Sequence, residues 1–233
     1  MTDRTTRDQL ERNKQAAGEF HRELEPEFIL AEDDLVTTCY YVPQPEPENL
    51  AASYDCYAFD TYRFQDGQVV EHWSSDNKIA PLTWQRARPK AHQLIDPGPP
   101  VSKEQIEANK RLVIDSYRYV FDAENPAAIK DFFAEDYQHH YPQFPPGRTG
   151  FDMFVNMLFP DGPRPVQPEL LRPPTILMAE GDMLIYVADR PQPELDDPTS
   201  KFTFLIYNAF KIRDGMLAEH WSGVNMAAPP NLD

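Results

Sequence analysis

The segment Asp66-Gly67-Gln68-Val69-Val70-Glu71-His72-Trp73-Ser74 decides the architecture, because its pattern returns as Asp214-Gly215-Met216-Leu217-Ala218-Glu219-His220-Trp221-Ser222. The copies lie 148 residues apart, and the match runs without a gap from Phe28 to Pro81, with 16 of 54 positions identical. A second match, Asn13-Lys14 with Asn109-Lys110, has an offset of 96 residues. The two offsets differ by 52 residues. The second copy therefore contains a 52-residue segment that the first copy lacks. Such self-similarity indicates a duplicated folding unit.

These offsets divide the chain into three parts. Residues 1–81 are expected to form a truncated domain, and residues 102–233 a complete one with a pocket. The proline-rich segment 82–101 has no periodic apolar pattern and is expected to connect them. The first copy is expected to lack the middle helices and the first short strand, and therefore an enclosed pocket of its own.

The complete copy predicts an α+β domain. Ser102 with Gln105 is a capping-box start, and Asn125-Pro126 opens a second helix. Asp214-Gly215 is a strong two-residue hairpin signal. The expected order is a helix over Lys103–Phe121, a short helix ending near Phe133, a strand over Tyr137–Tyr141, a helix over Arg148–Phe159, and four antiparallel strands. Helices on one face of a curved antiparallel sheet follow from this order.

Composition excludes several classes of function. The net charge of −16 and the absence of a Lys/Arg cluster disfavour binding to nucleic acid or anionic membranes. No apolar run has the length of a membrane span, and a cytoplasmic protein is expected. Two cysteines, Cys39 and Cys56, are too few for a disulfide framework or a zinc site. We expect buried free thiols, no bound metal and no cofactor.

A family resemblance rests on three motifs taken in order: Tyr137 to Pro142, Gly147 to Phe151, and Phe210 to Trp221. Together with the predicted elements, they resemble the SnoaL-like polyketide cyclases of the cone-shaped, nuclear-transport-factor-2-like superfamily. The resemblance covers about residues 103–226 and, in part, 6–81. It implies a hydrophobic pocket between sheet and helices, dimers with packed sheets, and aldol cyclisation with an aspartate as acid/base.

The chain departs from that family where the chemistry is expected. The family's histidine–tryptophan–aspartate reads His220-Trp221-Ser222, and its histidine–asparagine–proline reads His140-Tyr141-Pro142. Serine does not accept a proton at neutral pH as a carboxylate does. The resemblance therefore implies a pocket without its usual base.

The alternation of side chains along a strand predicts which residues face the site. His220 and Ser222 share one face of the last strand. If Asp214-Gly215 is a simple two-residue turn, His220 pairs with Ala209 and Ser222 with Tyr207. His220 and His140 are then the candidate acid/base residues, although each has a structural alternative. At most one of His139 and His140 can face the pocket. The expected ligand-binding residues are Tyr207, Ser222, Tyr186 and Tyr141.

Two functions follow from these residues. One is a cofactor-independent lyase, isomerase or cyclase that acts on a hydrophobic carbonyl compound through His220. The alternative is a non-catalytic small-molecule-binding protein that has lost the family's aspartate; a purely structural role is a third reading. The two halves are expected to form an intramolecular pseudo-dimer with Trp73 and Trp221 buried near its axis. A further homodimer is left open.

Overall fold

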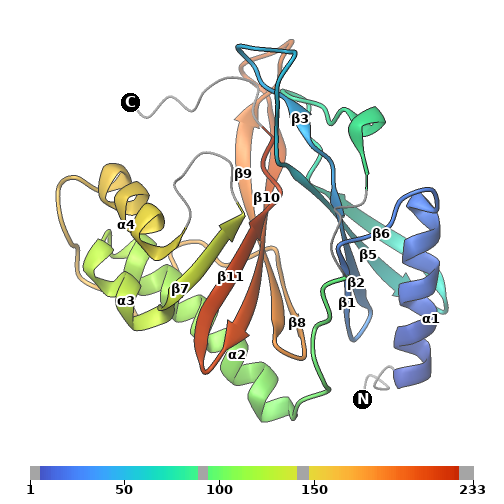
Figure 1. The fold of residues 1–233 in the computed structure, drawn as a ribbon, viewed down its shortest axis with the longest axis horizontal. Coiled ribbons are helices and arrows are strands. Elements are labelled where there is room, and N and C mark those ends of the chain that lie inside the picture. Colours follow the sequence, from blue (N-terminus) through green and yellow to red (C-terminus); the bar gives the residue numbers. More distant parts are fainter. Residues whose placement is uncertain (1–5, 89–93, 141–146, 226–233) are drawn as a thin grey trace.

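Two packed β-sheets form the centre of the molecule in the computed structural model, which describes residues 6–88, 94–140 and 147–225 (Figure 1). One sheet has the strand order β1-β2-β5-β6, and the other has the order β7-β11-β10-β9-β8. Helix α1 lies outside the first sheet, whereas α2, α3 and α4 lie on the far side of the second. The α+β class with mainly antiparallel sheets is thus as expected. None of the described helices is long and apolar enough to cross a membrane.

The N-terminal half keeps one helix and four main strands. Helix α1 (Arg7–Gly18) begins where Thr6 Oγ1 accepts a hydrogen bond from the backbone N–H of Gln9, which satisfies one of the free amides of the first turn. The other elements of this half are η1 (Glu19–His21), β1 (Phe28–Glu32), β2 (Leu35–Tyr41), β3 (Gln44–Pro45), β4 (Ser53–Tyr54), β5 (Tyr57–Gln65), β6 (Gln68–Ser74) and η2 (Trp84–Arg86).

The C-terminal half adds helices on the outer face of its sheet. Helix α2 (Lys103–Ser116) is capped by Ser102, as expected, and continues into a π-helical turn, η3 (Tyr117–Asp122). The remaining elements are η4 (Pro126–Ala128), α3 (Ile129–Phe132), β7 (Phe133–His140), α4 (Gly147–Leu158), β8 (Ile176–Glu180), β9 (Met183–Pro193), β10 (Lys201–Arg213) and β11 (Met216–Ser222). Strand β7 pairs parallel to β11, so this sheet is not purely antiparallel.

A β-bulge in the last hairpin changes the predicted pairing. Asp214 and Gly215 form the expected turn with positive φ values of 53° and 74°. The register then shifts between Lys211 and Ile212, because a bulge places one extra residue in one strand. The predicted pairing is therefore wrong beyond the bulge: His220 lies opposite Phe210, and Ser222 lies opposite Asn208.

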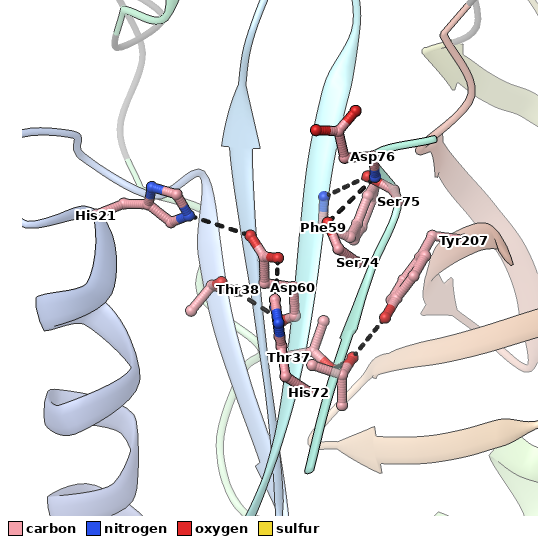
Figure 2. A network of polar contacts seen from close by, with 11 residues as sticks. His21, Thr37, Thr38, Phe59, Asp60, His72, Ser74, Ser75, Asp76 and Tyr207 are labelled. Atoms are coloured by element: carbon pink, nitrogen blue, oxygen red, sulfur yellow. Dashed lines mark hydrogen bonds and ion pairs between the residues drawn. The ribbon is translucent and has the colours of Figure 1, made fainter. Parts of the chain in front are cut away.

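The same bulge moves Tyr207 to the other face of the sheet. Tyr207 is fully buried between the two sheets, where its hydroxyl donates a hydrogen bond to Thr61 Oγ1 at 3.2 Å (Figure 2). Its ring stacks on Phe59 at 5.3 Å. Tyr207 is thus part of the core between the sheets and not of the face that carries His220.

Aromatic and aliphatic side chains from both halves make that core. Phe28 packs against Trp221 with ring centroids 5.7 Å apart. Trp221 is 2% exposed, whereas Trp73 is only partly buried and packs against the edge of the same cluster. Burying such large rings supplies most of the stabilisation between the sheets.

Ion pairs cross between the halves in a reciprocal pattern. Lys14 pairs with Glu180, whose other oxygen accepts a hydrogen bond from Ala31 N at 2.7 Å. In the opposite direction, Lys110 pairs with Glu32 at 2.7 Å, and Glu32 accepts from the backbone N–H of Ala179 at 2.8 Å. Each glutamate therefore binds a lysine and a backbone amide of the other half.

The described part of the proline-rich connection is packed against both halves. Ile95 N donates to Glu27 O at 2.8 Å, and Pro97 O accepts from Asp182 N at 2.8 Å. A Cβ at Gly181 would lie 2.0 Å from Pro97 O. A side chain at position 181 would therefore displace the connection.

Candidate functional site

A cavity of about 780 Å³ lies between the C-terminal sheet and its helices. It has the size of a small-molecule site. Its walls come from η3, β7, α4 and the three strands β9, β10 and β11, so the middle helices of this half complete it. Aromatic side chains dominate the lining: Tyr117, Phe121, Phe133, Tyr137, Phe151, Phe154, Phe159, Tyr186, Phe204 and Phe210.

His220 lies in this cavity and is held on both ring nitrogens. Its Nε2 is 2.9 Å from Asn208 Oδ1, and its Nδ1 is 3.4 Å from His139 Nε2. Asn208 Nδ2 faces Ile206 O at 3.4 Å, so Asn208 Oδ1 is left to accept a proton from His220 Nε2–H. Burial, followed by the neighbouring His139, lowers the pKa of His220 well below 6.5. His220 is therefore neutral at pH 7, with its lone pair on Nδ1.

His139, rather than His140, is the second histidine of the cavity. Strand β7 pairs His139 with His220 and His140 with Trp221, and adjacent strand residues face opposite sides. Burial lowers the pKa of His139 to about 4, with a smaller contribution from His140. His139 therefore stays neutral at pH 7 and can donate Nε2–H to His220 Nδ1.

His140 lies on the other face, which corrects its expected place in the pocket. Its ring stacks on Trp221 at 4.8 Å, and its Nε2 is 3.2 Å from Glu219 Oε2. That bond is the first cause of the lowered pKa of Glu219. This arrangement is a structural hydrogen bond at the edge of the core.

Tyr137 carries an unpaired hydroxyl in the cavity lining. The residue is fully buried, and its hydroxyl has no hydrogen-bond partner among the described residues. Burial raises its pKa well above 10, so the hydroxyl keeps its proton. A buried donor without a partner is unfavourable by about 1–3 kcal/mol, so an acceptor that reached this atom would be stabilised by it.

Charged residues of the cavity lie at its rim and are engaged elsewhere or exposed. Asp122 Oδ2 accepts from Leu171 N at 2.8 Å, and Glu124 pairs with Arg164 at 2.8 Å. Asp189 and Arg190 are exposed. The deep lining around His220 and Tyr137 therefore contains no carboxylate among the described residues, and no group there could hold a metal ion.

The residues predicted from sequence divide into three groups. His220, Ser222 and Tyr186 line the cavity, and Tyr186 stacks on Tyr117 at 4.1 Å. Tyr207 and His140 lie on the opposite face of the sheet. Tyr141 lies outside the described residues.

Sequence reasoning missed Tyr137, His139 and Asn208. The signal for the first two was the alternation of Tyr137-Gln138-His139 on one strand, which places both side chains on one face. Asn208 required the bulge, since only the shifted register brings it opposite Ser222.

No family model matches the chain, and no curated protein matches it. Matching solved structures include a SnoaL-like polyketide cyclase from Agrobacterium tumefaciens, 16% identical, with a TM-score of 0.34 over 51% of this chain and 91% of that one. A nuclear-transport-factor-2-like protein of unknown function from Mesorhizobium loti is 16% identical, with a TM-score of 0.37 over 54% and 98%. An epoxide hydrolase from M. tuberculosis is 11% identical, with a TM-score of 0.35 over 51% and 83%. TM-scores below 0.5 do not establish a shared function, so the function is inferred from the residues of the cavity.

Proposed function

We propose that the C-terminal cavity binds a small, uncharged, largely aromatic molecule through a carbonyl oxygen. The observation that carries this proposal is the Tyr137 hydroxyl, a buried donor without a partner among the described residues, on a side chain that lines the cavity. A ligand carbonyl is an acceptor that would satisfy it. Aromatic walls favour a flat apolar body.

Charge supports an uncharged ligand. His139 and His220 are both neutral at pH 7 because burial lowers the pKa of each. The cavity's two arginines, Arg172 and Arg190, are exposed to solvent and are not hydrogen-bonded to either histidine in the described part of the chain. An anion beside His139 and His220 would lose its hydration with only neutral partners in reach.

Binding of a matched pair of ligands tests this proposal. We expect 1-tetralone to bind better than tetralin, which has the same two rings without the oxygen. Tyr137→Phe removes only the hydroxyl. It should weaken the binding of 1-tetralone by about tenfold and leave the affinity for tetralin unchanged. Isothermal titration calorimetry with both ligands and both proteins gives all four affinities.

Equal losses for both ligands would contradict the hydrogen bond, since shape alone would then explain the effect. Absence of 1-tetralone binding to the native chain would contradict the cavity's proposed ligand class. Tyr137→Phe should fold at least as well as the native chain, because it removes an unsatisfied buried group.

A second candidate function is proton transfer at the ligand's α-carbon. The distance of 3.4 Å between His220 Nδ1 and His139 Nε2 favours it, since two imidazoles in contact can pass a proton. In D₂O, exchange of the α-hydrogens of 1-tetralone, followed by proton NMR, should be faster with the native chain than with His220→Gln. The same rate for both would leave binding as the function.

Ser222→Asp tests whether aldol-type chemistry is latent in the same cavity. Ser222 lines the cavity beside Asn208 and stands where the resembling family has its aspartate. A carboxylate there would supply the missing base, and the exchange rate should rise. No gain in Ser222→Asp would favour pure binding.

We also propose that the halves are tandem copies forming an intramolecular pseudo-dimer. Equivalent residues meet across a local axis: Phe59 stacks on Tyr207, and Asn77 bonds to Asn225, each pair 148 positions apart. The Lys14–Glu180 and Lys110–Glu32 pairs repeat each other in the opposite direction. Mutual contact of equivalent positions is the property of a twofold interface.

Cysteine cross-linking tests this arrangement. The double variant Asn77→Cys/Asn225→Cys should form an intrachain disulfide under mild oxidation, seen as a faster band in non-reducing electrophoresis. The single variants are the controls. Cross-linked dimers instead of the intrachain product would mean that the interface joins two chains.

A further inference from the structure

A second polar cluster lies in the N-terminal half, on the face of its sheet that α1 and η1 cover. The Asp60 side chain is only 4% exposed, and its carboxylate contacts two imidazoles (Figure 2). His72 Nε2 lies 2.7 Å from Oδ1, and His21 Nε2 lies 3.3 Å from Oδ2. His72 comes from β6, Asp60 from β5 and His21 from η1, so three elements converge on one carboxylate.

The carboxylate determines which nitrogen of His72 carries the proton. Burial alone would raise the pKa of Asp60, but the bonds from His21 and His72 outweigh it and lower that pKa. An ionised carboxylate only accepts hydrogen bonds, so His72 Nε2 carries a hydrogen. When His72 is neutral, its lone pair is therefore on Nδ1, and no described residue bonds to that atom.

His72 is also fixed in orientation and open to solvent. Its ring stacks on Tyr62 at 4.8 Å and 7°, and Phe20 stacks on the same tyrosine at 4.7 Å. His21 is held in turn against Trp84 at 4.5 Å. The His72 side chain is nevertheless 48% exposed, and Phe20 is 55% exposed. A planar molecule can thus reach the imidazole from solvent.

We propose that the N-terminal half carries a second site, at which His72 Nδ1 takes a proton from a small, neutral, planar C–H or O–H acid. His72 is the catalytic base. Asp60 is a positioning residue that fixes the tautomer and stabilises the imidazolium as it forms. His21 Nε2 lies 3.3 Å from the second oxygen of Asp60 and so limits rotation of the carboxylate.

The charge of the protein supports a neutral substrate. With a net charge of −16 and Asp60 beside the base, an anionic acid would be repelled. The two sites are independent, because Asp60 and His72 belong to the N-terminal sheet and the cavity to the other half.

The Kemp elimination of 5-nitrobenzisoxazole is a direct probe of such a base. His72 Nδ1 takes the proton from C3, the C–H electron pair forms the nitrile, and the N–O bond breaks to leave 2-cyano-4-nitrophenolate. The imidazolium then returns its proton to water. The probe is flat, neutral and aromatic, and its yellow product is measured by absorbance.

The full chain is expected to accelerate this reaction above buffer, and His72→Gln should remove the acceleration. Asp60→Asn keeps a hydrogen-bond acceptor for His72 but removes the charge, and should lower kcat by at least about tenfold. In the pH–rate profile, the Asp60→Asn variant should also shift the midpoint, which a merely structural role of Asp60 would leave in place.

His140→Gln is the matched control. His140 is a partly exposed histidine at 31% that also faces a carboxylate, Glu219, but it stacks on Trp221 in the core. It should keep the native rate. Loss of the rate in His140→Gln or His220→Gln, with His72→Gln unchanged, would overturn the proposal. A native rate equal to buffer would overturn it as well. Circular dichroism melts establish that each variant is folded.

Discussion

His72 in the N-terminal sheet and His220 in the C-terminal sheet occupy equivalent strand positions, yet their surroundings differ in one decisive residue. Both rings stack on the aromatic residue opposite, Tyr62 or Phe210. Both bond through Nε2 to a residue of the neighbouring strand. That residue is Asp60 in the first half and Asn208 in the second.

The difference shows how one substitution separates two chemical environments on the same backbone. A carboxylate supplies a negative charge beside the imidazole, so the first site is suited to proton transfer in contact with water. A carboxamide supplies only an acceptor, and burial keeps His220 neutral. The second site is therefore suited to holding an uncharged molecule.

The largest difference between the halves should appear when each equivalent tryptophan is removed. Trp221→Ala should lower the free energy of unfolding by about 3–5 kcal/mol, because Trp221 is in the core between the sheets. Trp73→Ala should lower it by about 1–2 kcal/mol, since Trp73 is partly exposed and covered by Arg63 at 5.5 Å. Urea unfolding measures both values. Equal losses of unfolding free energy would show that the two tryptophans contribute equally to the core between the sheets.

The polar partners of the two histidines give the next comparison. Asp60→Ala should destabilise by about 2–3 kcal/mol, as it removes a buried charge whose partners are partly solvated. Asn208→Ala removes a neutral acceptor from His220 and should destabilise by about 1 kcal/mol. Urea titrations at pH 7 measure both values. If Asn208→Ala lost more unfolding free energy than Asp60→Ala, the idea that the first half holds the buried charge would be wrong.

The two halves should also respond to acid in different pH windows. The pKa of His139 is lowered from 6.5 to about 4 in the folded chain, so the unfolded chain binds more protons between these values. Stability therefore falls as pH drops from 6.5 to about 4, and His139→Gln should flatten this loss by about 1–3 kcal/mol.

Asp60 acts below that window. Because its folded pKa is lowered, its contribution is complete above about pH 4 and is lost as pH falls through the folded pKa. Asp60→Asn should flatten only this lower part of the curve of unfolding free energy against pH. If Asp60→Asn instead flattened the curve between pH 5 and 6.5, the loss of stability in that range would come from the N-terminal half and not from His139.

The smallest expected effect comes from the two reciprocal ion pairs, which compare the two halves directly. Lys14→Ala and Lys110→Ala each remove one of the reciprocal pairs, and each should destabilise by about 1 kcal/mol. The two values, from thermal unfolding at low and high salt, should agree within error and shrink together with salt. A clear inequality would show that the interface is not twofold.

Much of the architecture is readable in the sequence because the repeat is long and gap-free. The hairpin turns at Asp66-Gly67 and Asp214-Gly215, the Ser102 cap and the four consecutive antiparallel strands β8 to β11 follow from local chemistry. Strand β7 was expected at Tyr137 and begins at Phe133, because the tertiary pairing with β11 extends it over a helical pattern.

The site was harder to predict because it depends on the bulge at Lys211. One extra residue reverses the faces of everything beyond it, which removed Tyr207 from the pocket and brought in Asn208. The choice between His139 and His140 likewise required the parallel register with β11. The Asp60 cluster was missed because its third member, His21, comes from the 3-10 helix η1, where the sequence predicts that the first helix continues to Leu24.

In the tandem arrangement that we propose, the difference between positions 60 and 208 has a consequence for inheritance. In an assembly of two identical chains, one codon change alters both sites at once, so a substitution that helps one and harms the other is not retained. When both sheets are encoded in a single reading frame, each position mutates alone. The Asp60 and Asn208 sites can then specialise separately while they share one folded core.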